Sequence, residues 1–307
     1  MEESTAVIIL SITSIIVVPL NALCLLVIGC SKYLRTKTIS IITSGLLSMH
    51  LLQGVFVMPF YALKRKYESK LYCVIFRFTY MITFYGTCML VLIISIDRLL
   101  ATKLMTAYRI RVTNKRVSVT ILFSMIYIII LSLIPFLNQN QQCLYNPQKE
   151  WVLCMLFVNC ALPYFFVVLI YICIVCRIKS SLQILGPGRL HNNISNRFNT
   201  LNNKLTKFTL YVGLTYGIAW TPSIFYYVLL HLAPSAFPKD YVSSTAENFI
   251  SFFMKYIKCL EGVTTPILYC YFHAGFRKEF KRKCSKHRIT VATIRLSVCQ
   301  HKQCITR

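Results

Sequence analysis

Long stretches without Asp, Glu, Lys or Arg constrain this chain more than any other feature. A helix needs about 20 predominantly apolar residues to cross the ~30 Å hydrocarbon core of a bilayer. Uncharged stretches of that kind lie at residues 4–31, 38–63, 78–96, 117–148, 152–176 and 208–238. A further candidate at 248–274 is interrupted by Lys255, Lys258 and Glu261, and a peripheral or re-entrant helix would also explain it. The pattern predicts an all-α membrane protein with a marginal last span.

Composition narrows the class of protein further. The chain of 307 residues is 56% apolar and only 14% charged, whereas roughly 25% of residues are charged in ordinary globular chains. It still carries 34 Lys and Arg against 9 Asp and Glu, a net charge of +25. Disorder is excluded because disordered chains are poor in apolar residues. The same apolar content disfavours a soluble nucleic-acid binder, so no nucleic-acid partner is expected.

The basic residues also predict the orientation of the chain, because cytoplasmic loops of membrane proteins are rich in Lys and Arg. The first, third and fifth connections and the C-terminal tail hold 25 of the 34, and the opposite side holds 9. We therefore expect a multi-pass plasma-membrane protein with an extracellular N-terminus and a cytoplasmic C-terminus, which requires an odd number of spans. The first stretch lacks a preceding basic segment and is too long for a signal peptide, so it is predicted to be the first span.

Short motifs follow one another in order along these stretches. Their residues are Asn21 in the first stretch, Cys73 and Asp97-Arg98-Leu99 around the third, Pro163 and Tyr171 in the fifth, Ala219-Trp220-Thr221-Pro222 in the sixth and Thr265-Pro266-Ile267-Leu268-Tyr269 in the seventh. Arg98 lies 25 residues after Cys73. In the order and spacing of these motifs, the chain resembles the rhodopsin-like (class A) G-protein-coupled receptors over almost its whole length.

The resemblance implies a seven-transmembrane helix bundle in one domain, residues 1–275. Its spans would lie at about 5–31, 38–62, 71–97, 117–137, 152–176, 206–232 and 247–272. The basic tail, 276–307, would begin with a short amphipathic eighth helix at the membrane surface, which contains Phe276 and Phe280. Cys284 follows that stretch and is a candidate for palmitoylation.

The resemblance also assigns an activation switch. Asp97 would hold Arg98 at rest, and Arg98 would turn toward a heterotrimeric G protein on activation. Many receptors add an acid in the sixth span; Asn202 takes its place here, and Thr206 offers only a hydroxyl, so we expect a weaker lock and higher basal activity. Prolines kink helices by removing a backbone donor. The remaining switch residues would be Tyr171, Trp220, Pro222, Pro266 and Tyr269.

Two further features depend on the resemblance. It implies a disulfide between Cys73 and Cys143, which would tie the second outer loop to the third span. It also implies a mid-membrane polar network of Asn21, His50, Thr87, Glu261 and Thr265. His50 replaces the family's sodium-binding Asp, and Glu261 and Thr265 each replace an Asn. We expect a neutral network of His50 and Glu261 in place of the sodium site.

The ligand pocket implied by the resemblance contains Tyr80, Trp220, Lys255 and Lys258. Tyr80 stands where amine receptors have an Asp, which disfavours a monoamine. Retinal is disfavoured because the opsin lysine position is Cys259, and one residue rotates a helical side chain by about 100°. Lys255 and Lys258 share one helix face and favour an anionic or carboxylate-bearing ligand. The alternative is that Lys258 pairs with Glu261 while Lys255 extends to water.

The expected partners are therefore a heterotrimeric G protein, membrane lipids and an extracellular small molecule, lipid or peptide. No catalytic motif, cofactor or metal site is expected. A transporter or channel that uses His50 and Glu261 as a polar relay is the alternative class of function.

Overall fold

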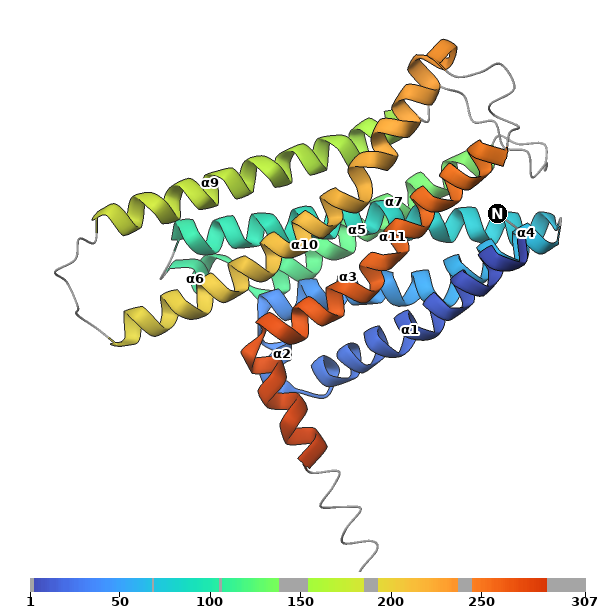
Figure 1. Cartoon of the computed structure of the whole chain (residues 1–307). Coiled ribbons are helices and arrows are strands. Elements are labelled where there is room, and N and C mark those ends of the chain that lie inside the picture. Colours follow the sequence, from blue (N-terminus) through green and yellow to red (C-terminus); the bar gives the residue numbers. More distant parts are fainter. Residues whose placement is uncertain are drawn as a thin grey trace, which may run out of the picture.

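A computed structural model describes residues 3–67, 69–104, 107–137, 154–184, 193–236 and 245–285, and the regular structure in these ranges is entirely helical (Figure 1). The long helices are α1 (Glu3–Gly29), α3 (Thr38–Leu52), α5 (Lys70–Leu104), α7 (Asn114–Leu137), α9 (Leu162–Ile184), α10 (Asn193–Leu232) and α11 (Thr245–Phe272). The short elements are α2 (Lys32–Arg35), η1 (Gln53–Val57), α4 (Met58–Lys66), α6 (Tyr108–Arg111), η3 (Phe157–Ala161) and η4 (Pro234–Ala236). Residues 274–285 form a further helix.

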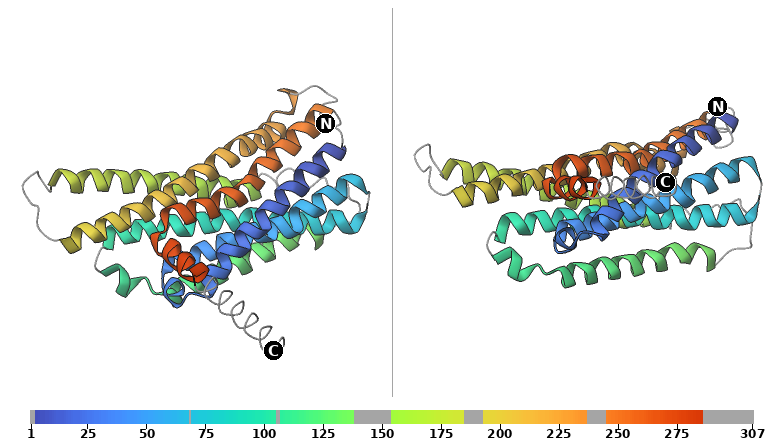
Figure 2. Two further views of the ribbon diagram at one scale, coloured as in Figure 1. Left: turned by 60° about the horizontal axis from the view of Figure 1, so that its bottom comes forward. Right: turned by 90° about the horizontal axis from the view of Figure 1, so that it is seen from below.

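The long helices lie side by side as one bundle around α5 (Figure 2). Helix α5 contacts α3, α4, α7, α9 and α10, whereas α11 contacts α10, α1 and α3. The helix at 274–285 turns away from α11 at the end of the bundle opposite the N-terminus (Figure 1). Helices α2 and α6 lie at that same end of the bundle (Figure 1).

Five segments among the described residues are long and apolar enough to cross a membrane: Thr5–Gly29, Thr38–Lys64, Lys70–Leu104, Asn114–Ile134 and Cys154–Arg177. Helices α10 and α11 are long but more polar. Helix α11 carries Lys255, Lys258 and Glu261, as the sequence had indicated, and α10 is rich in Tyr and Thr. Hydropathy alone thus identifies five spans.

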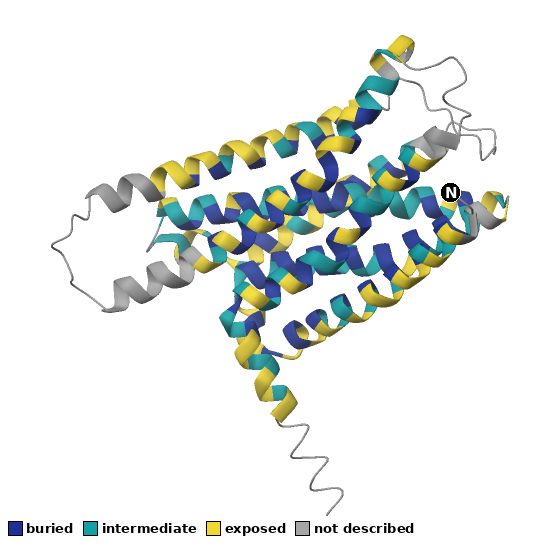
Figure 3. Cartoon of the chain, in the orientation of Figure 1, coloured by how far each residue is buried: buried dark blue, intermediate teal, exposed yellow. Residues whose placement is uncertain are grey.

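Side-chain exposure follows the pattern of a membrane protein (Figure 3). Large apolar side chains cover the outside of the bundle, for example Ile15 at 72%, Phe123 at 67% and Ile218 at 72% exposure. Polar side chains are buried inside it, including Asn21, His50 and Glu261. Water would oppose this arrangement, because exposed apolar area costs roughly 25 cal/mol per Å². A bilayer favours it, and the chain is a multi-pass membrane protein.

Two of the expected spans contain a π-helical turn. Segment η1 interrupts the second span shortly before Pro59, and η3 precedes α9, whose second residue is Pro163. A proline removes one backbone donor and crowds the preceding turn, and a wider turn relieves that clash. These two π-helical turns were not predicted from the sequence.

Candidate functional site

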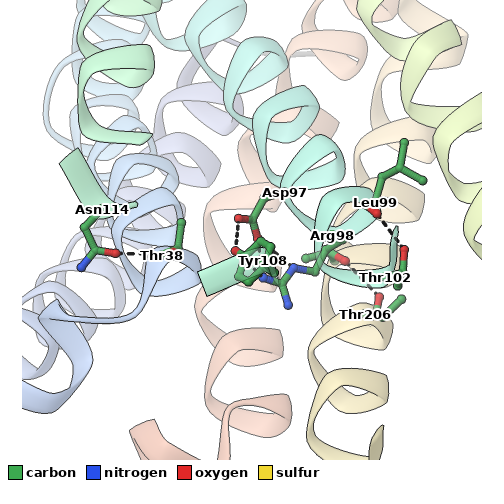
Figure 4. Close-up of polar contacts among 9 residues, drawn as sticks. Thr38, Asp97, Arg98, Leu99, Thr102, Tyr108, Asn114 and Thr206 are labelled. Atoms are coloured by element: carbon green, nitrogen blue, oxygen red, sulfur yellow. Dashed lines mark hydrogen bonds and ion pairs between the residues drawn. The ribbon is translucent and has the colours of Figure 1, made fainter. Parts of the chain in front are cut away.

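At the end of α5, Arg98 is held by two oxygen-bearing neighbours (Figure 4). Its Nε donates a hydrogen bond of 2.9 Å to Asp97 Oδ2, and its Nη2 forms an ion pair with the same oxygen. The Tyr108 hydroxyl, on α6, donates to the other carboxylate oxygen, Asp97 Oδ1. Arg98 Nη2 also lies 3.5 Å from the Tyr108 hydroxyl. Asp97 and Arg98 are only 3% and 4% exposed, so the ion pair of this three-residue cluster is buried, whereas Tyr108 is partly exposed.

Thr206 does not take part in this cluster. It lies on α10 in the same region and is buried, but its hydroxyl has no hydrogen-bond partner within the described part of the chain (Figure 4). The hydroxyl lock considered from the sequence is thus not formed in this structure. Tyr108 provides the second contact instead, from the connection between α5 and α7. Tyr108 was not identified as a site residue from the sequence. The sequence feature that could have indicated it is the presence of a tyrosine within a short basic connection.

A cavity of about 670 Å³ opens beside Arg98. Tyr33, Lys37, Tyr108, Lys115, Leu205 and His273 are among its lining residues. His273 lies just beyond α11, where its Nδ1 accepts a hydrogen bond of 2.9 Å from the Phe276 backbone N–H. Burial lowers the pKa of His273 from its ordinary 6.5 to about 4, so this side chain is neutral at pH 7. A neutral His273 can accept the bond that begins the 274–285 helix.

The two inward-facing tyrosines, Tyr171 and Tyr269, have separate partners. Ser95 Oγ donates to the Tyr171 hydroxyl over 3.4 Å, and the Tyr269 hydroxyl donates to Ser40 Oγ over 3.0 Å. Phe208 packs edge-on against Tyr269, with 5.7 Å between ring centroids. No hydrogen bond joins the two tyrosines in this structure, among the residues it describes.

The mid-membrane residues form a hydrogen-bonded group that differs from the one expected. His50 Nε2 lies 3.2 Å from Thr265 Oγ1, and His50 Nδ1 lies 3.4 Å from Gln53 Oε1. Asn21 Nδ2 donates to the Gly262 carbonyl over 2.7 Å and so joins α1 to α11. Among the residues that the structure describes, the Thr87 hydroxyl donates only to the Thr83 carbonyl of its own helix. The sequence reasoning had paired His50 with Glu261, but no described contact joins them, and Gln53 was not anticipated.

Lys258 is the most unusual side chain of the bundle, because it is 3% exposed and carries an ammonium group. Its Nζ lies 4.5 Å from the Phe84 ring centroid, 4.8 Å from that of Trp220 and 5.9 Å from that of Tyr227. It also donates to the Tyr80 hydroxyl over 3.4 Å. An aromatic face attracts a desolvated cation by about 2 kcal/mol. Three rings and one hydroxyl therefore take the place of a counter-ion.

Glu261 lies one turn further along α11 but does not pair with Lys258. Among the described residues, the only ion pairs are Asp97–Arg98 and Glu279–Arg282. Within the described part of the chain, Glu261 Oε1 and Trp220 Nε1 are buried and form no hydrogen bond. Both residues line a small chamber of about 10 Å³, together with Lys258 and Tyr80. A chamber of that size holds about one water molecule.

Trp220 connects this chamber to the rest of α10. Its ring lies 3.7 Å from Phe84 and 4.8 Å from Tyr216, centroid to centroid. Pro222 follows within the same helix, and Pro266 lies within α11. Trp220, two residues before Pro222, thus contacts both α5 and the lysine of α11.

Lys255, which the sequence analysis assigns to the ligand pocket, is anchored within the protein. Its Nζ donates to Ser251 Oγ over 2.9 Å and lies 5.5 Å from the Tyr61 ring centroid. Cys73 is buried near the start of α5 and is disulfide-bonded, but Cys143 lies outside the described residues, so their pairing stays a prediction. Cys284 is exposed on the 274–285 helix.

The described bundle of long helices thus carries a buried Asp–Arg ion pair near one end and a buried Trp220, followed by Thr221 and Pro222, within α10. The sequence profile described as 7 transmembrane receptor (rhodopsin family) matches residues 20–269. The chain belongs to that family and is a G-protein-coupled receptor. No curated protein sequence matches the chain significantly.

Proposed function

We propose that the chain is a plasma-membrane receptor that crosses the bilayer seven times, with an extracellular N-terminus and a cytoplasmic C-terminus. An extracellular ligand shifts the bundle, and the end that carries Arg98 then activates a heterotrimeric G protein. The observation that carries this proposal is the buried Asp97–Arg98 ion pair, with its contact to Tyr108, beside the 670 Å³ cavity.

Two features support α10 and α11 as the sixth and seventh spans. Polar groups of both helices face the protein, since Thr209 and Ser223 of α10 and Lys258, Glu261 and Thr265 of α11 are buried. Their outer faces are apolar, with Leu214, Ile218, Phe225, Phe253 and Ile267 among the exposed side chains. Ionisable groups in membranes are tolerated when they face the bundle interior. Residues 1–275 would then form the receptor domain, and the 274–285 helix would lie at the membrane surface.

The switch follows from the contacts of Arg98. While Asp97 holds the guanidinium, Arg98 stays against the wall of the cavity and is not free to extend into it toward a partner. Outward movement of α10 at its kink near Pro222 would widen the cavity and release Arg98. Tyr171 and Tyr269, which now bond to Ser95 and Ser40, would be free to approach one another in the opened bundle.

The ligand is proposed to carry an anionic group. Lys258 supports this, because its ammonium has no carboxylate partner in the described part of the chain. The pocket floor is closed in this structure, since its chamber measures about 10 Å³. An anionic ligand that enters past Lys255 would attract Lys258 away from Trp220 and so free the indole. The described contacts favour this reading over a polar relay, which would need His50 and Glu261 to meet.

A panel of G-protein activation assays in cells tests the proposed function without a known ligand. Basal activity of the wild-type chain would exceed that of Arg98→Ala at equal surface expression for at least one G-protein class. Exposed Arg111→Ala, on α6, provides a matched control in the same cytoplasmic region. Equal signals from the wild type and Arg98→Ala across all classes, with and without candidate anions, would argue against G-protein coupling.

A further inference from the structure

A groove of about 460 Å³ lies where α1, α11 and the 274–285 helix meet. Apolar side chains form its walls, among them Leu20 and Leu23 from α1 and Ile267 from α11. Phe276 and Phe280, whose rings stack 6.3 Å apart, close its third side. Leu23 and Ile267 are 46% and 53% exposed, so the groove opens to the outside of the bundle, where acyl chains would lie.

Two cations stand on the third wall of this groove. Arg277 and Lys281 both line it, and they are one helical turn apart on one face of the 274–285 helix. Arg277 Nη1 donates to the carbonyls of Cys270, over 3.3 Å, and Tyr271, so its guanidinium is fixed against the last turn of α11. A guanidinium has five N–H donors, and those on Nε and Nη2 remain for another acceptor.

The single acid of that helix is occupied elsewhere. Glu279 Oε2 accepts a hydrogen bond of 2.9 Å from Ser31 Oγ and pairs with Arg282 over 2.7 Å. Those two contacts lower the pKa of Glu279, which keeps it ionised. Neither Arg277 nor Lys281 forms an ion pair with any residue that the structure describes. On the face of this helix beside Ser31, the charge of Arg282 is neutralised by Glu279. On the face beside the groove, no described acid neutralises the charges of Arg277 and Lys281.

We propose that this groove binds one anionic phospholipid, with an acyl chain against Leu23 and Ile267 and the phosphate on Arg277 and Lys281. The inference rests on the proposed orientation, in which this end of the bundle meets the cytoplasmic leaflet. Anionic lipids collect in that leaflet, and each nearby basic residue contributes about 1 kcal/mol of attraction. A zwitterionic lipid fits the apolar walls equally well but leaves the two cations without a net counter-charge.

Photo-crosslinking tests the site directly. The full-length receptor is placed in phosphatidylcholine nanodiscs with a trace of phosphatidylserine that carries a diazirine in its acyl chain, and the adducts are mapped by mass spectrometry. Adducts are expected on the α1 and α11 segments around Leu23 and Ile267. Lys281→Gln is expected to reduce them several-fold, and Ile267→Trp, which fills the groove, is expected to reduce them as well. Lys278→Gln, which removes an exposed charge from the same helix but not from the groove, is the matched control and is expected to change nothing.

Three results would overturn the proposal. Equal labelling by a diazirine phosphatidylcholine would show that charge plays no part. Equal losses in Lys281→Gln and Lys278→Gln would show a diffuse charge effect. Adducts that form only in Cys284→Ser would show that an acyl chain attached to Cys284 occupies the groove. Nanodiscs present the anionic lipid on both sides and the readout is an adduct, so failure of G-protein signalling would leave this result standing.

Discussion

Tyr108 donates a hydrogen bond to the Asp97 carboxylate that holds Arg98, and it does so from a different helix. The connection between α5 and α7 is thereby joined to the residues of the proposed switch. Because the tyrosine satisfies Asp97 Oδ1, the carboxylate is fixed in the position that binds the guanidinium. Release of Arg98 then requires two contacts to break, and one of them depends on where α6 lies.

Replacement of Tyr108 by Phe is expected to raise basal signalling. A hydrogen bond to a charged group contributes about 1.5–3 kcal/mol, and every 1.4 kcal/mol is tenfold in an equilibrium. The opened fraction should therefore rise by about tenfold where it is small. Basal G-protein activation, normalised to surface expression, measures the change. Tyr33→Phe is the control because Tyr33 lines the same cavity but contributes no hydrogen bond from its hydroxyl within the described residues. A Tyr108→Phe receptor as quiet as the control would contradict the second lock.

Replacement of Lys258 by Met is expected to stabilise the receptor while it abolishes the response to anionic ligands. Burial of a charge costs several kcal/mol, and no carboxylate offsets that cost at Lys258. The apolar replacement keeps the length of the side chain among Phe84, Trp220 and Tyr227. The thermal unfolding midpoint in detergent should rise by a few degrees, whereas exposed Lys103→Met should leave it unchanged. A midpoint that falls by several degrees would mean that the three rings and Tyr80 compensate the ammonium fully.

Replacement of Gly262 by Ala is expected to destabilise the contact between α1 and α11. A Cβ at Gly262 would lie 2.9 Å from Val17 Cγ1 and 3.6 Å from His50 Cβ, in a place where the Asn21 amide also bonds to the glycine carbonyl. Overpacking of that kind costs about 1–3 kcal/mol. Gly29→Ala is the control, because a Cβ there meets nothing within 4 Å. Thermal unfolding of both purified variants measures the difference, and equal midpoints would rule out a close approach at Gly262.

Acid is expected to weaken the end of the bundle that carries Arg98, through His273. Its pKa of about 4 in the folded protein lies below the ordinary 6.5, so its stabilising effect is complete above pH 6.5 and is lost as the pH falls toward 4. The nearby charges of Arg98, Arg277 and Lys37 also oppose its protonation. The loss approaches about 3 kcal/mol, at 1.36 kcal/mol for each pKa unit.

The variant His273→Gln isolates this effect, because Gln offers an uncharged acceptor to the Phe276 N–H. Unfolding midpoints of the wild type and His273→Gln, measured between pH 7.5 and 4.5, should diverge below pH 6.5, with the wild type losing more. Parallel curves would show that His273 does not titrate in this range.

Much of the fold could be predicted from where charges are missing. The uncharged stretches locate α1, α3–α4, α5, α7 and α9, because a bilayer excludes charge along a whole span. Helix boundaries were harder. Helix α5 continues to Leu104, past the expected end at 97, since the residues after Asp97 lie beyond the apolar core and hydropathy no longer marks them.

The site could be predicted only in part, for a physical reason. Motif residues such as Asp97 and Arg98 are adjacent in sequence, so their contact follows from the chain itself. Tyr108 and Gln53 were missed because their roles depend on which groups reach them in three dimensions. Glu261 and Thr265 are one turn apart on α11, and the direction of each side chain decides that Thr265, rather than Glu261, meets His50.

The closed chamber around Lys258 has a consequence for any search for the ligand. The Lys258 side chain already fills the space in which the charged group of the proposed ligand would lie, so a ligand must displace this side chain in order to bind. Compounds chosen for their fit to this closed cavity would be small and uncharged, and they would miss the cation altogether. A ligand is better sought among molecules whose anionic group competes with Phe84, Trp220 and Tyr80 for one ammonium, and whose affinity includes the work of moving it.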